Sequence, residues 1–304
     1  MKNSVLNQCE GGLINTTFTA ENSLGKWIIQ KVSNIFDSDV TDNIKQVTRH
    51  LKKHSVPTIN IVESLSGKLS ITIGTEVFRV LDFIPGKHPD VENAYECGKH
   101  LSIFHKALSD ADFTGSTREL HNTVSHMLFL KSTIEKHQSH RLLSQVITAA
   151  NSIDEMYSGL KKQPKVSSFV HGDPKRENFF IYNNQILLLD LDTCGYHDFG
   201  GEIGDALRGW SNIKGNFDKK VFTDFLEGYN TLAVSDSDRI SNEFAVNSTI
   251  RIALELAARF AADALNESYF GWDSAGFSSR GEHNMARAYQ QIYFAKQLLL
   301  NKEI

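Results

Sequence analysis

The sequence has few cysteines and no pattern that would join them. Its three cysteines, Cys9, Cys97 and Cys194, lie far apart and form no Cys-x-x-Cys pair. An odd number of widely separated cysteines argues against a disulfide framework and against a structural zinc site built on thiolates. We therefore expect a protein of a reducing compartment.

The chain also lacks the features of membrane proteins and nucleic-acid-binding proteins. No apolar run approaches the roughly 20 residues that a membrane-spanning helix needs, and residues 1–10 lack the layout of a secretory signal. The formal net charge is −4, so no general positive field would attract nucleic acid or an anionic membrane. We expect a cytoplasmic protein whose partner is a small molecule. The sequence leaves the oligomeric state open.

What is present is an ordinary globular composition, with 40% hydrophobic and 22% charged residues among 304. This length suits one large domain or two packed domains. Two β-rich runs near the N-terminus are joined by turn-forming residues and predict a hairpin. The strands expected in this first part are 13–20, 26–32, 59–63, 70–73 and 76–83, with one helix over 39–54.

After Pro85-Gly86 the pattern becomes mostly helical. The long amphipathic segments are 91–109, 117–137, 141–162, 217–230, 238–266 and 282–301. One β-rich island, between residues 169 and 190, interrupts them. The expected fold class is therefore α+β, with a small β-rich N-terminal lobe at 1–84 and a large, mostly helical C-terminal lobe at 85–304.

The β-rich island carries the strongest chemical signal. Phosphoryl transfer needs a carboxylate that orients the attacking hydroxyl, oxygen ligands for Mg²⁺ and a cation near the phosphoryl group. Asp173 fits the first role, and Asn178 and Asp190 fit the second. Lys175 can lean over the phosphate. Taken separately, Asp173-Pro174 reads as a plain turn and Asn178 as a strand cap, but the combined spacing favours a kinase catalytic loop.

Three other features of this region are less informative. The segment Asp198-Phe199-Gly200 spells the metal motif of protein kinases, yet it does not follow a buried strand, so Asp190 is the better ligand. We expect Asp205 to cap a helix or to brace the catalytic loop. His171 is expected to hold that loop by hydrogen bonds rather than to move protons.

The form His171-Gly172-Asp173, followed after four residues by Asn178, resembles the aminoglycoside phosphotransferase and choline kinase branch of the kinase superfamily. Further segments, in order along the chain, are similar to the N-acetylhexosamine 1-kinase family: 12–18, 29–33, 43–48, 189–193, 258–263, 269–270 and 283–287. The resemblance implies a two-lobe protein-kinase-like fold. It also implies ATP- and Mg²⁺-dependent phosphorylation of the anomeric hydroxyl of an N-acetylhexosamine.

Two departures from that family concern the acceptor. The catalytic loop begins His171-Gly172, where the hexosamine kinases are expected to have His-Asn, and the segment 271–277 has no counterpart. The alternatives are therefore an aminoglycoside, choline or another amino alcohol, or homoserine as acceptor, or an inactive nucleotide-binding relative. The late helices carry as many arginines as carboxylates, which favours a neutral or anionic acceptor such as a sugar.

The resemblance also implies where ATP binds. Asn15 follows a Gly-Gly pair that could cover phosphates, and Lys31 stands where the superfamily keeps its phosphate-binding lysine. The run Asp82-Phe83-Ile84 matches the linker whose backbone contacts adenine. The helix over 39–54 contains no glutamate to pair with Lys31, so Asp42 is a stand-in or the pair is absent.

Polar residues in the late, alanine-rich helices are the expected contacts of the acceptor. They are Arg208, Arg259, Asp263, Asn284 and Arg287. Arg259 and Asp263 are four residues apart on one helix face, so an ion pair between them is an equal alternative. Asp192 could reach the acceptor or could only support Asp190.

Overall fold

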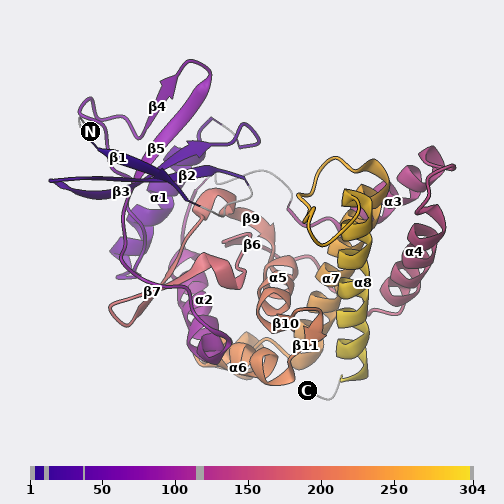
Figure 1. Cartoon of the computed structure of the whole chain (residues 1–304). Coiled ribbons are helices and arrows are strands. Elements are labelled where there is room, and N and C mark those ends of the chain that lie inside the picture. The colour runs from indigo at the N-terminus through magenta and orange to yellow at the C-terminus, as the bar shows by residue number, and fades with distance from the viewer. Residues whose placement is uncertain (1–3, 10–13, 37, 114–119, 302–304) are drawn as a thin grey trace.

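The computed structural model describes residues 4–9, 14–36, 38–113 and 120–301. A five-stranded antiparallel sheet and one helix form its N-terminal part (Figure 1). The order across the sheet is β1 (Val5–Gln8), β2 (Thr16–Asn22), β3 (Gly25–Val32), β5 (Glu76–Asp82) and β4 (Ser70–Ile73). Helix α1 (Val40–Lys53) follows β3. The predicted β2–β3 hairpin and the helix are confirmed.

One predicted strand is wrong, and one strand was not predicted. Residues 59–63 form only an isolated bridge, Ile61 to Leu81, beyond the end of β4. The strand at the sheet's other edge is β1, which pairs with β2 from Val5 opposite Glu21. Its four residues are all exposed, so no buried face gave this strand an alternating apolar pattern.

The register of β3 on β5 decides which side chains face the rest of the molecule. Gln30 lies opposite Arg79, and Lys31 lies opposite Phe78. Successive side chains of a strand point to opposite faces. Gln30 therefore shares a face with Val32, which packs in the core with Ile44 of α1. Lys31 points to the other face.

The segment after the sheet already pairs with the helical part. Lys87 bridges to Ile181, and its backbone N–H donates to the Ile181 carbonyl oxygen at 3.0 Å. This contact favours a lobe boundary at residue 84, and the division into 1–84 and 85–304 stays a prediction.

The C-terminal part is mostly helical, with three two-stranded sheets inserted in it (Figure 1). Its helices are α2 (Ala94–Leu108), α3 (Thr123–Lys136), α4 (Leu143–Ser158), α5 (Phe199–Ser211), α6 (Lys219–Asn230), α7 (Asn242–Asn266) and α8 (Arg280–Leu300). Its strands are β6 (Ser167–Val170), β7 (Phe179–Tyr182), β8 (Gln185–Leu188), β9 (Gly195–Asp198), β10 (Asn212–Ile213) and β11 (Asn216–Phe217). The helix expected to begin at 117 begins at Thr123, and 114–119 lie outside the described residues.

Helix α5 was not predicted, because its glycines weaken the helical pattern. The Asp198 carboxylate caps its first turn by accepting a hydrogen bond from the Gly201 N–H at 3.1 Å. Asp198 also pairs with Arg251 of α7 at 2.5 Å. The glycines allow α5 to approach α7 closely, since a Cβ on Gly204 would lie 2.4 Å from the Ser248 carbonyl oxygen. Asp198 therefore caps α5 and pairs with α7.

The core beneath the catalytic region is aromatic. Trp210 of α5 packs edge-on against Phe179 at 5.3 Å between ring centroids, and it contacts Phe225 of α6 at 5.4 Å. All three side chains are almost fully buried. Among the residues that the structure describes, no helix combines the length and apolar content needed to cross a bilayer.

Glycines allow α2 and α6 to touch backbone to backbone. A Cβ on Gly98 would lie 2.0 Å from the Phe225 carbonyl oxygen, and one on Gly228 would lie 1.9 Å from the Tyr95 carbonyl oxygen. No real Cβ contact is this short, so a methyl group here would force the helices apart.

We predict that Gly228→Ala destabilises the protein by about 1–3 kcal/mol, because overpacking outweighs the better helix propensity of alanine. Urea unfolding measures this change. Gly159→Ala is the control, since its Cβ would meet nothing closer than 3.5 Å. Equal stability of the two variants would contradict the close α2–α6 contact.

Candidate active site

The loop between β6 and β7 holds the predicted catalytic residues. Gly172 has a φ of +89°, a conformation that side chains disfavour. A Cβ there would also lie 2.6 Å from the Thr193 carbonyl oxygen. The loop therefore needs glycine at this position both for its turn and for its close contact with the segment after Asp190.

A buried carboxylate, Glu202 of α5, fixes the loop from behind. It accepts hydrogen bonds from the backbone N–H groups of His171 at 3.1 Å and Gly172 at 2.8 Å, and from His105 Nε2 at 3.0 Å. Burial alone would raise its pKa, but these hydrogen bonds and the neighbouring histidines hold the pKa of Glu202 below its ordinary value. Sequence reasoning missed this residue, because the glycines around it concealed the helix.

His171 connects the catalytic loop to the strand that precedes Asp190. Its Nε2 donates to the Leu189 carbonyl oxygen at 2.8 Å, and its Nδ1 accepts from the Asp173 N–H at 3.3 Å. The side chain is fully buried, and burial lowers the pKa of His171, which favours the neutral ring. These contacts agree with the expected role of a loop-holding residue.

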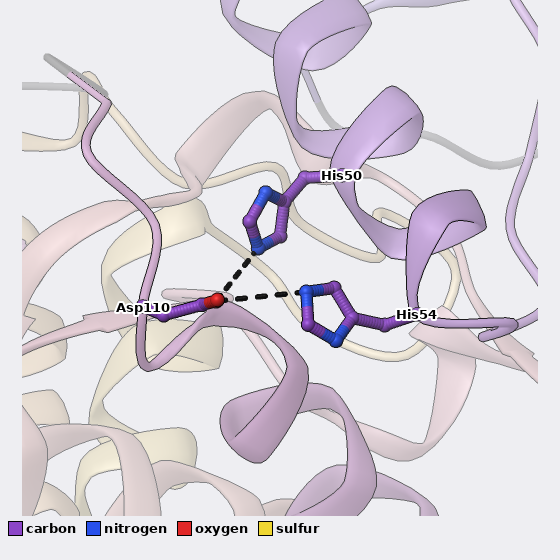
Figure 2. Close-up of side chains that lie close together, drawn as sticks. All are labelled: His50, His54 and Asp110. Carbon is purple, nitrogen blue, oxygen red and sulfur yellow. Dashed lines mark hydrogen bonds and ion pairs between the residues drawn. The ribbon is translucent and has the colours of Figure 1, made fainter.

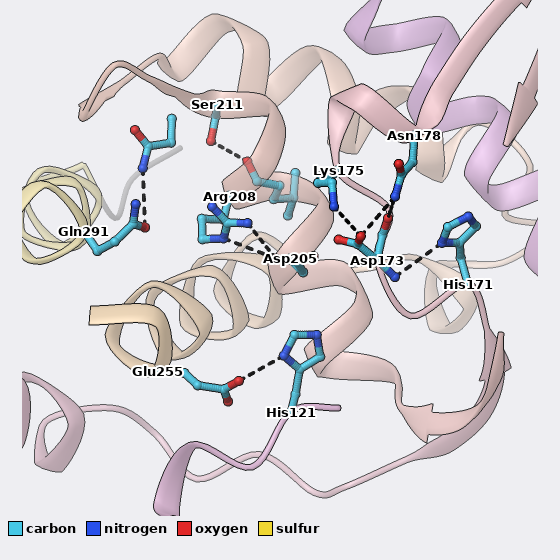
Figure 3. A network of polar contacts seen from close by, with 12 residues as sticks. His121, His171, Asp173, Lys175, Asn178, Asp205, Arg208, Ser211, Glu255 and Gln291 are labelled. Carbon is cyan, nitrogen blue, oxygen red and sulfur yellow. Dashed lines mark hydrogen bonds and ion pairs between the residues drawn. The ribbon is translucent and has the colours of Figure 1, made fainter. Parts of the chain in front are cut away.

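Asp173, Lys175 and Asn178 lie together at the end of this loop (Figure 3). Lys175 Nζ makes an ion pair with the Asp173 carboxylate. Asn178 Nδ2 donates to the Asp173 carbonyl oxygen at 2.7 Å and to its Oδ2 at 3.1 Å. Burial lowers the pKa of Lys175, but the Asp173 carboxylate more than offsets this and raises it, so the lysine stays charged.

Asp190 follows β8 in a left-handed backbone conformation, with a φ of 57°. A non-glycine residue seldom adopts this conformation, and such residues gather at functional sites. Asp190 is exposed on one side, but nearby protein atoms desolvate its carboxylate in part, and Asp192 and Asp173 add negative charge. Together these effects raise the pKa of Asp190 to about 7. A group that is so costly to ionise is suited to a bound cation.

The carboxylate of Asp192 is fully enclosed and paired. Arg79 of β5 donates from both terminal nitrogens, at 2.5 Å to Oδ1 and 2.7 Å to Oδ2. Asn15 Nδ2 donates to Oδ2 at 2.6 Å, and Asn15 Oδ1 accepts from the Ser33 N–H at 2.9 Å. These contacts tie the N-terminal sheet to the segment after Asp190. Asp192 therefore supports the segment next to Asp190. Of its two expected roles, reaching the acceptor or supporting Asp190, the contacts agree with the second.

The structure does not bring Lys31 to the other predicted site residues. Lys31 Nζ pairs with Glu76 at 3.0 Å on the outer face of the sheet, and both side chains are partly exposed. The expectation that it faces the nucleotide is corrected by the β3 register, which turns Gln30 inward instead. Gln30 accepts a hydrogen bond from Arg79 Nε at 2.9 Å. Asp42 is likewise not the partner of Lys31.

The predicted adenine linker leaves the sheet at the end of β5. The Asp82 N–H donates to the Asn60 carbonyl oxygen at 3.1 Å, and its Oδ2 accepts from Asn60 Nδ2 at 2.9 Å. Phe83 lies under Lys26, whose Nζ is 4.5 Å from the ring centroid. Ile84 is partly buried and packs against the core.

Arg208 and Asp205 lie one turn apart on α5, close to Lys175 (Figure 3). Arg208 pairs with the Asp205 carboxylate at 2.8 Å. Burial would raise the pKa of Asp205, but Arg208 and the other nearby cations lower it. Gly209, the next residue, lets the loop approach, since its Cβ would lie 3.2 Å from Lys175 Cα. Asp205 thus lies beside the loop, which fits the expected brace.

Asp263 is bound by backbone amides and by Asn284, rather than by Arg259 as in the ion pair considered above. It accepts hydrogen bonds from the backbone N–H groups of residues 268, 269 and 270 at 2.9–3.0 Å. Asn284 Nδ2, fully buried, donates to it at 2.8 Å. The expectation that these two residues are free to bind the acceptor is therefore corrected, because their polar atoms organise the chain between α7 and α8.

Two arginines remain near that segment. Arg259 lies 5.6 Å from the Phe270 ring centroid, and Arg287 lies 5.5 Å from that of Phe260. Arg287 also donates to the Gly271 carbonyl oxygen at 2.6 Å. In Figure 1 the connection between α7 and α8 lies at the ends of these helices that face the N-terminal part. Arg259 lies on α7 and Arg287 on α8, so the two arginines stand on either side of this connection in the chain.

Asn178 and Asp190 fit a divalent cation. Asn178 Nδ2 donates to Asp173, so the side-chain oxygen of Asn178, its Oδ1, is left as a possible ligand atom. Oxygen donors of this kind, an amide and a carboxylate, are those that hard divalent cations prefer. Asp190 supplies the negative charge.

Comparison with known proteins agrees with this arrangement. The sequence profile of the phosphotransferase enzyme family matches residues 5–239. An aminoglycoside phosphotransferase from Alicyclobacillus acidocaldarius shares 14% identity and a TM-score of 0.68, over 98% of this chain and 92% of that one. A microcompartment-associated aminopropanol kinase shares 12% identity and a TM-score of 0.68, over 99% and 94%.

An amicoumacin kinase in complex with AMP-PNP and Ca²⁺ is also similar, with 16% identity and a TM-score of 0.65, over 95% of this chain and 87% of that one. These neighbours confirm the expected two-lobe kinase-like fold. The family profile covers most of the chain, in which the catalytic loop and the buried Arg79–Asp192 pair lie. The chain therefore belongs to the phosphotransferase enzyme family.

Proposed function

We propose that the protein is a small-molecule kinase that transfers the γ-phosphoryl group of ATP to a substrate hydroxyl. The observation that carries the proposal is the cluster of Asp173, Lys175 and Asn178 beside Asp190. Asp173 orients the attacking hydroxyl and accepts its proton. Lys175, which pairs with Asp173 here, moves to the phosphate oxygens when ATP binds. A cytoplasmic location stays a prediction.

Asn178 Oδ1 and the Asp190 carboxylate would hold Mg²⁺. When bound, the cation would offset the negative charge of the phosphate oxygens. Binding at Asp190 also explains why this chain keeps a carboxylate whose pKa is about 7, since a cation stabilises the ionised form.

Arg79 is the cation that the N-terminal sheet turns toward Asp192, and its buried guanidinium is fully used by Asp192 and Gln30. It fixes the segment after Asp190 and lies on the inner face of the sheet. Asn15, also bound to Asp192, is fixed at the end of the segment that contains the Gly-Gly pair, whose residues 10–13 lie outside the described part of the chain. Backbone groups of the linker formed by Asp82, Phe83 and Ile84 would contact adenine.

The charges near the α7–α8 connection favour a neutral or anionic acceptor. Asp263 is used by backbone amides and Asn284, and Asp205 is paired with Arg208. Arg259 and Arg287 are two cations beside this connection, and the hydroxyl groups of a sugar would find donors in their guanidinium groups. We therefore propose a sugar 1-kinase, with an N-acetylhexosamine as acceptor.

ATP consumption with Mg²⁺ across hexoses, N-acetylhexosamines, amino alcohols, aminoglycosides and homoserine tests the proposal. We expect turnover of an N-acetylhexosamine that is lost when its anomeric hydroxyl is blocked. Turnover of an amino alcohol or aminoglycoside instead would keep the kinase and discard the sugar. Binding of ATP without turnover of any acceptor would indicate an inactive relative.

We predict that Asp173→Asn lowers kcat by about 10²–10⁴-fold, because the hydroxyl loses its proton acceptor. The affinity for ATP should change little, since Asn178 and Asp190 are unaltered. Steady-state kinetics and ATP titration measure the two effects. Asp224→Asn, which alters an exposed pair with Lys220, is the control. Retained turnover in Asp173→Asn would exclude this mechanism.

We predict that Arg79→Gln destabilises the protein by about 3–5 kcal/mol and raises KM for ATP, because Asp192 is left buried without its cation. Lys31→Met should change stability by at most about 1 kcal/mol, since its ion pair with Glu76 is exposed. Urea unfolding and ATP kinetics distinguish them. A larger loss of ATP binding in Lys31→Met than in Arg79→Gln would show that the lysine, not the arginine, serves the nucleotide.

A further inference from the structure

Two histidines at the C-terminal end of α1 and one aspartate after α2 form a cluster away from the catalytic loop (Figure 2). His50 lies in the last turn of α1 and His54 is its C-cap residue four positions later, so the two side chains lie on the same side. Asp110 follows the last turn of α2 and points between the two rings. The cluster therefore joins the helix of the N-terminal part to the first long helix of the C-terminal part.

The separations of the ligand atoms suit one small metal ion. Asp110 Oδ1 lies 3.0 Å from His50 Nε2 and 3.6 Å from His54 Nε2. All three groups offer ligand atoms within 4.8 Å of one another. In a tetrahedral zinc site with bonds of about 2.0–2.1 Å, neighbouring ligand atoms are about 3.3 Å apart. The observed spacing needs only small side-chain movements to match this value.

The cluster is accessible and chemically suited to a borderline metal. The side-chain exposures of His50, His54 and Asp110 are 13%, 34% and 60%, so an ion can reach them and a water molecule can complete the coordination. Two imidazoles and one carboxylate are the donors that Zn²⁺ uses where one position stays open.

We propose that His50, His54 and Asp110 form a binding site for Zn²⁺ or a similar transition-metal ion, which clamps α1 to the end of α2. In the metal-free form His50 Nε2 also lies 2.9 Å from the Ala107 carbonyl oxygen. On binding, His50 becomes the Nδ1-protonated tautomer: Nδ1 takes up a proton from solvent as Nε2 releases one to it, the Nε2 lone pair turns to the metal, and this hydrogen bond is exchanged for coordination.

This site does not depend on the proposed kinase reaction. Its donors include imidazole nitrogen, which suits zinc, whereas Asn178 and Asp190 offer only oxygen, which suits magnesium. Excess Mg²⁺ can therefore occupy the oxygen site while zinc is titrated into the histidine site. Cys9, a partly exposed thiol, is the competing soft ligand and is replaced by serine throughout.

The test is calorimetric titration of ZnCl₂ into the full chain carrying Cys9→Ser, stripped with a chelator and held in excess Mg²⁺. We expect one Zn²⁺ per chain. Loss of an outer-shell partner already weakens metal sites by about 10–100-fold, so His54→Ala, which removes a ligand, should weaken binding by at least about 100-fold. Zinc should also raise the melting temperature of the parent and not that of His54→Ala, because the metal binds the folded form.

Two further variants keep the test independent of folding. Asp110→Asn retains the shape of an exposed side chain, so the fold is preserved while the charged ligand is lost, and affinity should again fall. His140→Ala is the matched control: His140 Nε2 lies 3.6 Å from Glu267, a histidine–carboxylate pair outside this cluster, and its loss should leave affinity unchanged. The proposal would be overturned if the parent bound no zinc. It would also be overturned if His54→Ala and Asp110→Asn bound zinc with the same affinity as the parent.

Discussion

The burial of Asp192 is the constraint on which the site depends. A carboxylate removed from water must be paired, because the cost of leaving it alone is several kcal/mol. Arg79 and Asn15 meet that need from the N-terminal sheet. The sheet is therefore positioned over the segment after Asp190 by charge as well as by apolar packing. Because Asp192 is fixed by these contacts, the position of Asp190, two residues earlier, is restricted as well.

The second constraint acts from the helical side. Glu202 binds two backbone amides of the catalytic loop, and His171 binds the carbonyl of Leu189, next to Asp190. The loop and the strand end are consequently one unit, with their relative position set by hydrogen bonds that are shielded from water. Such shielded bonds are stronger than exposed ones, which suits groups that must be aligned before the substrate arrives.

Much of this could be predicted from the sequence, and the failures have physical reasons. The spacing of Asp173, Asn178 and Asp190 identified the catalytic loop because these residues are close along the chain. Lys31 was misplaced because a single-residue change of register turns a strand side chain to the other face, and the register was not readable. Arg79 was missed because its partner is 113 residues away. Helix α5 was missed because its glycines lower the helix propensity of the segment, although they allow close packing against α7.

The hydrogen bonds of Asp263 stabilise the end of α7 without involving the exposed residues that follow. The carboxylate fixes residues 268–270 and thereby the end of α7, whereas residues 271–276 beyond it are exposed. Substitutions at exposed positions change stability little. Mutations can therefore accumulate in this short stretch without unfolding α7 and α8, so its surface can change while the two helices keep their packing.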